Sequence, residues 1–150
     1  NTSFSFQDNS LQRFTKACSM VQNYQTHDIN QPVVDYAFEI LNDVAVDGFT
    51  KWSIVYDLKN KKIHFKTDRF RDIKSASMSS FDFSCKSKAM VFDMNQPVKG
   101  EIEQAFQHDT GELNAQIVER LAEESKSQVA ISEKDKQRHI SYAKGIHCKN

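Results

Sequence analysis

The sequence predicts an α+β fold, because helix-like and strand-like patterns occupy separate blocks of the 150-residue chain instead of alternating. Apolar residues recur every three to four positions in the first third of the chain and again after Pro97, as in amphipathic helices. Between these blocks, from Lys51 to Met94, the period falls to two, as in strands that bury one face. We therefore expect two helices, at least four strands paired antiparallel, and then two or three more helices.

The composition is that of a folded domain with its own core. Hydrophobic residues make up 39% of the chain and charged residues 27%, and 11 phenylalanines exceed what a disordered chain carries. We expect a single domain over residues 1–150, with residues 144–150 as a frayed tail. Lys and Arg balance Asp and Glu at 20 each, which argues against nucleic acid or an anionic membrane as the main partner. No apolar run approaches the ~18–20 residues of a membrane span.

Two helices are predicted before the strands. The first begins near Asn9 and Ser10, which are favourable N-cap residues, and carries an apolar stripe that we expect to be buried: Phe14, Ala17, Cys18 and Val21. The second covers residues 32–45, with Pro32 in its first turn and one apolar face: Val34, Ala37, Phe38, Leu41 and Ala45. The dipeptide Asp47-Gly48 then predicts a turn.

The most regular pattern is the segment 52–67, WSIVYDLKNKKIHFKT, which predicts a hairpin. Trp52 is interpreted as a core or inter-layer aromatic, not as a residue that stacks on a ligand. The turn at Lys59–Lys61 lacks glycine, so Asn60 is expected to supply the left-handed conformation. The basic turn is interpreted as solvated, and His64 as a surface residue.

Weaker signals follow the hairpin. The Ser-rich segment 69–80 is expected to be a loop or an edge strand, and period-two runs at 81–85 and 90–94 predict two more strands. A short helix is predicted at 102–106. A longer helix should start at a capping box formed by Asp109 and Glu112, and its stripe contains Leu113, Ile117 and Leu121. A final helix is predicted from Ser132, with Asp135 at the capping-box position.

Taken alone, the residues contain no catalytic motif. Glycine-rich phosphate loops, zinc-protease motifs and nucleophile elbows are missing, and no cofactor or metal is predicted. The three cysteines, Cys18, Cys85 and Cys148, lack metal-ligand spacing and are expected to be free thiols in or near a core. His147 next to Cys148 is not interpreted as a catalytic pair, because neighbouring side chains on a helix or strand diverge. Arg13 lies beside the predicted buried stripe, either as a salt-bridged surface residue or as a group that orients a carboxylate, thiolate or carbonyl.

Three phrases occur in a recognisable order: SLQRF at 10–14, FEILNDVAVDGFTKWSIVYDLKNKKIHFKT at 38–67, and FDFSC at 81–85. In the second, an Ile-Leu-Asn-x-Val phrase ends a helix, and a Trp-x-x-Val-Tyr-Asp strand and an aromatic partner strand follow. This order, over roughly residues 9–107, resembles the C-terminal half of the choloylglycine hydrolase family. These linear amide C–N hydrolases include penicillin V acylases and bile salt hydrolases.

The resemblance implies a four-layer αββα sandwich of the N-terminal nucleophile type, of which residues 1–150 would be the C-terminal half. In that family an N-terminal Cys attacks the amide carbonyl, its own α-amine is the base, and an acyl-enzyme is hydrolysed. The nucleophile and most of its neighbours belong to the N-terminal half, which this chain does not contain. Arg13, in the Ser-x-x-Arg-Phe phrase, is the one catalytic position that can be carried over.

The resemblance therefore implies that this chain alone is inactive and needs a partner. That partner is either the missing half or second chain carrying the nucleophile, or another copy in a homo-oligomer, because half a sandwich leaves an apolar sheet face uncovered. The expected substrate is a small amide: a bile salt, penicillin V or an acyl-homoserine lactone. A periplasmic or secreted location is slightly favoured over the cytoplasm. The alternative reading is a non-catalytic α+β interaction or regulatory domain.

Overall fold

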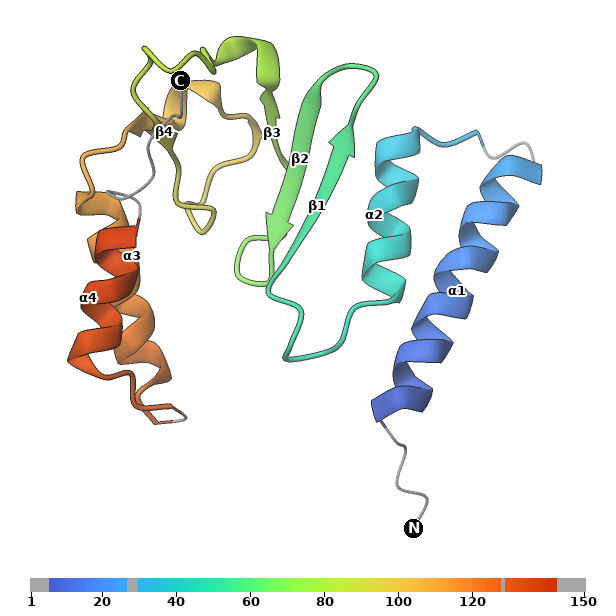
Figure 1. Ribbon diagram of the computed structural model, residues 1–150. Helices are drawn as coiled ribbons and strands as arrows, with labels where there is room; N and C mark the ends of the chain where they lie inside the picture. The colour runs from blue at the N-terminus through green and yellow to red at the C-terminus, as the bar shows by residue number, and fades with distance from the viewer. Residues whose placement is uncertain (1–5, 27–29, 128, 143–150) are drawn as a thin grey trace.

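In a computed structural model, the protein is described over residues 6–26, 30–127 and 129–142 (Figure 1). The elements in chain order are α1 (Phe6–Thr26), α2 (Val33–Asp43), β1 (Trp52–Asp57), β2 (Lys62–Thr67), β3 (Lys74–Ser77), η1 (Met78–Ser80), β4 (Met90–Val91), β5 (Gly100–Glu101), η2 (Glu103–Ala105), β6 (Gln107–His108), α3 (Glu112–Ser125) and α4 (Glu133–Tyr142). The predicted α+β class is confirmed. The described elements contain one four-stranded sheet and a two-stranded ribbon, so the four-layer sandwich stays a prediction.

The predicted hairpin is present with full register. Strands β1 and β2 pair antiparallel from Trp52 opposite Thr67 to Asp57 opposite Lys62. The turn differs in one detail from the prediction, because Lys61, with φ of 53°, takes the left-handed conformation instead of Asn60. Asn60 acts through hydrogen bonds: its backbone N–H and its side-chain amide donate to the Asp57 carboxylate at 2.9 and 2.7 Å. The basic turn is exposed, as predicted.

The sheet has the strand order β1-β2-β3-β5. Strand β3 comes from the segment predicted as a loop or edge strand, yet it lies between β2 and β5, antiparallel to one and parallel to the other. Alternation along the paired strands defines two faces. One, here called the aromatic face, carries Trp52, Ile54, Tyr56, Ile63, Phe65, Lys74 and Ala76; the opposite helix face carries Ser53, Val55, Lys62, His64, Lys66 and Ser75.

The hydrophobic core lies on the aromatic face. Phe65, Ala76 and Ile102 are its buried members. Rings from the later loops pack on them, and Phe106 lies 4.8 Å from the Phe81 ring and 5.3 Å from the Phe92 ring, centroid to centroid. This aromatic cluster holds segment 81–106 against the sheet, although most of the segment has no regular secondary structure.

Helix α1 corrects two predictions. It begins at Phe6, so Asn9 and Ser10 lie inside the helix and do not cap it. The stripe expected to be buried faces outward, with Phe14 67% and Val21 47% exposed and Cys18 exposed as well. A different side of α1 meets α2, where the Tyr24 and Tyr36 rings stack at 4.9 Å.

Helix α2 follows its prediction. Pro32 precedes its first residue, and Phe38 on the predicted apolar face is buried. In Figure 1, α2 lies between β1 and α1, while α3 and α4 lie together at the other end of the molecule, beside β4.

The C-terminal half of the chain follows its predicted strands and caps only in part. Residues 81–85 form a loop instead of a strand, and the run at 90–94 supplies only the two residues of β4. The predicted helix at 102–106 is the short η2. Helix α3 starts after Gly111, whose φ is 79°, and Asp109 accepts a hydrogen bond from the Gly111 N–H instead of forming a capping box.

Ser132 caps the N-terminus of α4, as predicted, and Asp135 bonds to the Ser132 side chain. The Ser132 hydroxyl accepts the Asp135 N–H at 3.1 Å and donates to the Asp135 carboxylate at 2.6 Å. The expected frayed tail, 144–150, lies outside the described residues.

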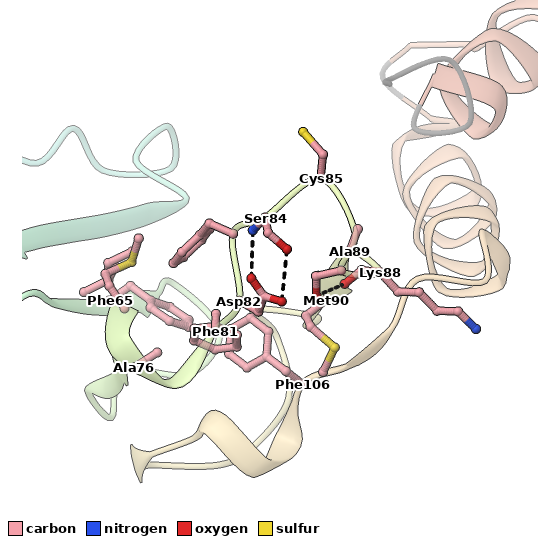
Figure 2. A pocket seen from close by; sticks show the side chains of 14 residues that line it. Phe65, Ala76, Phe81, Asp82, Ser84, Cys85, Lys88, Ala89, Met90 and Phe106 are labelled. Carbon is pink, nitrogen blue, oxygen red and sulfur yellow. Dashed lines mark hydrogen bonds between the residues drawn. The ribbon is translucent and has the colours of Figure 1, made fainter. Parts of the chain in front are cut away.

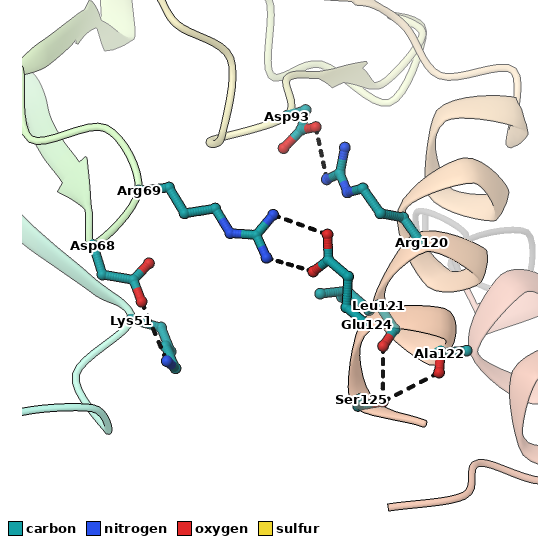
Figure 3. A network of polar contacts seen from close by, with 9 residues as sticks. All are labelled: Lys51, Asp68, Arg69, Asp93, Arg120, Leu121, Ala122, Glu124 and Ser125. Carbon is teal, nitrogen blue, oxygen red and sulfur yellow. Dashed lines mark hydrogen bonds and ion pairs between the residues drawn. The ribbon is translucent and has the colours of Figure 1, made fainter. Parts of the chain in front are cut away.

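Two Arg–carboxylate pairs join α3 to the rest of the molecule (Figure 3). Arg69, after β2, donates through both terminal nitrogens to the Glu124 carboxylate, and Arg120 donates to Asp93 at 2.9 Å. Neither α3 nor α4 contains a buried residue. The two pairs are therefore prominent among the contacts that dock this helical hairpin.

Candidate functional site

Arg13 lies in the second turn of α1 and reaches across to the end of α2. Its Nε donates a hydrogen bond to the Val44 carbonyl oxygen at 2.6 Å. Val44 is the C-cap residue of α2, so the guanidinium binds one of the carbonyls that a helix terminus leaves without an internal partner. The positive charge also complements the negative end of the α2 dipole. The two terminal amino groups of Arg13 form no hydrogen bond or ion pair with another described residue.

Other contacts fix the same two helices to each other. Lys16 pairs with Asp43 at 3.0 Å, and the Tyr36 hydroxyl donates to the Met20 carbonyl at 2.9 Å. These contacts hold the Arg13 side chain against the start of the loop 44–50, which leads into β1. The loop itself is closed by Thr50, whose hydroxyl oxygen accepts the Val46 N–H at 2.9 Å.

A cleft of about 680 Å³ lies beside this loop, between the end of α2 and the start of the hairpin. We call it the basic cleft, after its two cations: Lys66 from β2 and Arg71 from the loop before β3. The Lys66 Nζ donates to the Asn42 side-chain oxygen at 2.7 Å and lies 5.2 Å from the centre of the Phe38 ring. Burial, and then the nearby Arg71 charge, lower the pKa of Lys66.

A second cavity, an apolar hollow of about 790 Å³, lies on the aromatic face (Figure 2). Its walls include Ile63, Phe65, Met78, Phe81, Phe83 and Phe106. At the rim, the Asp82 carboxylate accepts hydrogen bonds from the Ser84 N–H and hydroxyl at 2.8 and 3.1 Å, and Lys88 points away from the rings. The hollow is therefore better suited to bind apolar groups than to catalyse an acid–base reaction.

Two buried polar atoms on the sheet have no hydrogen-bond partner in the described structure. One is Nζ of Lys74, a residue that is fully buried on the aromatic face and whose amine lies 5.6 Å from the centre of the Phe70 ring. The other is Nε2 of His64, on the helix face, whose Nδ1 lies 2.8 Å from the Ser75 hydroxyl. Burial lowers the pKa of Lys74, because removing an ammonium from water disfavours the charged form.

Several predicted roles change with the structure. His64 is part-buried and paired with Ser75, so its interpretation as a surface residue is wrong. Trp52, predicted to be a core or inter-layer aromatic, is 59% exposed in this chain and lines the basic cleft. Cys18 is a free but exposed thiol, whereas Cys85 is disulfide-bonded, so the expectation of a free thiol fails there. Cys148 and His147 lie outside the described residues.

Three cations of these sites, Lys66, Arg71 and Lys74, were not predicted from the sequence. Lys66 occupies a polar position in the alternating pattern of β2, and the sequence pattern does not show that α2 lies over it. The burial of Lys74 is even harder to predict, because a lysine within a Ser-rich stretch is expected to be exposed to solvent. Its burial could be predicted only if β3 were already known to pair between β2 and β5.

Comparisons with protein-family models, curated proteins and solved structures give no match to this chain. Within residues 6–26, 30–127 and 129–142, no three His, Cys, Asp or Glu side chains lie where they can share a metal ion. None of the described helices combines the length and apolar character that crossing a bilayer requires.

Proposed function

We propose that this chain is the C-terminal segment of a cysteine N-terminal nucleophile amidohydrolase that cleaves a linear amide C–N bond. The nucleophilic Cys belongs to a partner segment or second chain, and the substrate is a small N-acyl amide such as a bile salt, penicillin V or an acyl-homoserine lactone. The carrying observation is the Trp-x-x-Val-Tyr-Asp phrase, which occupies β1 in full and pairs with Ile63, Phe65 and Thr67 of β2.

The part of the aromatic face that β1 forms supports the need for a partner. Trp52 and Tyr56 project from it with 59% and 62% of their surfaces exposed, and Ile63, opposite Tyr56, lines the apolar hollow. Apolar patches of this kind on a soluble protein mark interaction surfaces. A partner layer packed over β1 would bury the Tyr56 ring, as facing layers do in two-sheet sandwiches.

Arg13 is proposed to orient the catalytic thiolate of the partner. Its Nε is held by the Val44 carbonyl, which leaves the planar guanidinium with its terminal N–H groups directed from a fixed position. A guanidinium fixed by one backbone contact is preorganised for a second, charged partner. Arg13 is thus a positioning residue that also ties α1 to α2.

The disulfide at Cys85 supports an exported protein. Disulfides persist in oxidising compartments and are rare in the cytosol. This agrees with the periplasmic or secreted location that the family resemblance slightly favours.

The first experiment asks whether the partner exists. Mass spectrometry of the protein purified from its source should find a polypeptide with an N-terminal Cys associated with this chain, either separate or encoded upstream in the same reading frame. Recovery of the native protein without any such polypeptide would overturn the proposal. It would favour the alternative, a non-catalytic interaction domain, which the exposed aromatic face also fits.

The second experiment tests Arg13 in the complete enzyme. Arg13→Ala should lower kcat for penicillin V or a glycine-conjugated bile salt at least about 100-fold, while circular dichroism stays unchanged. Lys16→Ala is the matched control, because Lys16 docks the same two helices through Asp43. If both variants lose activity equally, Arg13 acts only as a helix tether. If neither does, it has no role in hydrolysis.

A further inference from the structure

The basic cleft contains two cations without a carboxylate partner. Lys51, Lys62, Arg69, Arg120 and Lys136 each form an ion pair within the described part of the chain, whereas no ion pair there includes Lys66 or Arg71. The Arg71 charge disfavours the protonated form of Lys66. The repulsion between two like charges that line one cleft is relieved when an anion binds near both.

The carboxylates of the cleft do not neutralise this pair. Asp68 lines the cleft but is bound by the Lys51 amine at 3.2 Å. Asp47, on the exposed loop after α2, is the one that opposes an entering anion, and it forms no ion pair with a described residue. Because Asp68 is paired with Lys51, which does not line the cleft, the unpaired charges of the lining are the cations Lys66 and Arg71 and the one carboxylate of Asp47.

The remaining walls supply hydrogen-bond donors and a flat apolar surface. Thr50 and Thr67 each accept a backbone N–H through the hydroxyl oxygen, so each keeps its own hydrogen to donate. Trp52 forms a wall of the cleft with more than half of its surface exposed. A ring can stack on this indole while its charged group lies near the cations.

We propose that the basic cleft binds a small ligand that carries an oxyanion, a carboxylate or a phosphate, between Lys66 and Arg71, with an aromatic or other apolar part against Trp52. Arg71 is suited to the two oxygens of such a group because its guanidinium is a planar fork of donors. Lys66 is held in place by Asn42 and Phe38 and acts as the fixed point charge. The site goes beyond the proposed hydrolase function and does not depend on it.

Trp52 is the one tryptophan of the chain, so its fluorescence reports on this cleft directly. The full chain is titrated with benzoate, phenyl phosphate and inorganic phosphate at constant ionic strength, with sodium chloride as the blank. We expect a saturable change for both aromatic anions with Kd on the order of 1 mM, as for a small ligand with few contacts. Tighter binding of benzoate assigns the site to carboxylates, and tighter binding of phenyl phosphate assigns it to phosphate esters.

Variants separate the cleft from general electrostatics. Arg71→Gln and Lys66→Gln should each weaken binding at least tenfold, whereas Asp47→Asn should strengthen it severalfold. Lys88→Gln, an exposed cation at the other cavity, should change nothing. Should Lys66→Gln misfold, the exposed Arg71 variant still decides the result. No saturation with either aromatic anion, or an equal loss with Lys88→Gln, overturns the proposal.

Discussion

Replacing Lys74 by methionine should stabilise this protein. Lys74 is fully buried on β3, and its Nζ has no hydrogen-bond partner in the described structure. Its favourable electrostatic interactions are the contact with the Phe70 ring and the attraction of the Asp72 carboxylate, which is weaker than the effect of burial. Methionine keeps most of the aliphatic stem and removes the amine, so an unsatisfied donor disappears from the interior.

The magnitude follows from three opposing contributions. A buried donor without a partner destabilises the folded state by about 1–3 kcal/mol. Loss of the cation–π contact destabilises the variant by about 0.5–1 kcal/mol. The shorter side chain leaves a gap of about one methylene, worth ~0.8 kcal/mol. Taken at their midpoints, the three contributions leave a net gain of about 0.5 kcal/mol, or about 1–2 °C in Tm for a chain of this size.

Urea unfolding followed through Trp52 fluorescence measures this gain, with Lys99→Met, at an exposed lysine, as the control. The pH dependence gives a second test. Because burial lowers the pKa of Lys74, the unfolded state binds its proton more readily, and the wild type is weakened below the folded-state pKa. That weakness fades as the pH rises toward the ordinary value of 10.5, so the advantage of the variant should shrink there. A Lys74→Met protein less stable than Lys99→Met, or an advantage independent of pH, would refute the reasoning.

Two further predictions concern packing and docking. Arg69→Gln should release α3, raising amide hydrogen exchange in that helix. The Arg69 hydrogen bond lowers the pKa of Glu124, so the wild-type ion pair should be present above pH 4.5 and should be lost as the pH falls through the folded-state pKa. Hydrogen exchange of α3 measured near pH 3 should therefore no longer differ between the two proteins. Phe106→Ala, which removes a ring that contacts two others, should lower the free energy of unfolding by about 2–3 kcal/mol. The exposed Phe83→Ala should change it by less than about 0.5 kcal/mol, and equal losses would contradict this account of the core.

The sequence predicted the elements whose own pattern is strong and local. The hairpin 52–67 and helix α2 follow from regular alternation and from a continuous apolar face, and both are present. Strand β3 could not be predicted, because four residues of the Ser-rich segment pair only when β2 and β5 are already beside them. Residues 81–85 were wrongly predicted as a strand, because Phe81 packs in the aromatic cluster and Phe83 is mostly exposed, so their alternation marks no hydrogen-bonded strand pair.

The candidate sites divide in the same way. Arg13 could be selected from its sequence phrase alone, although its contact with Val44 could not. Lys66 and Arg71 are brought together by the return of the chain after β2 and by the end of α2, so no sequence spacing marks them as a pair. A site assembled from three separate segments leaves no local pattern.

The failed burial predictions bear on the proposed partner. Phe14 on α1 and Trp52 on β1 both follow strong apolar periodicity, and both are mostly exposed. Single exposed apolar residues are ordinary, but here they continue as stripes, with Leu11 and Val21 beside one and Tyr56 beside the other. A sequence that maintains an apolar period along an element gains stability from it only when that face is covered. The two stripes therefore support separate contact surfaces, one on the helical layer and one on the sheet, and a partner that covers only the sheet would leave the α1 stripe for a further helix or a second copy.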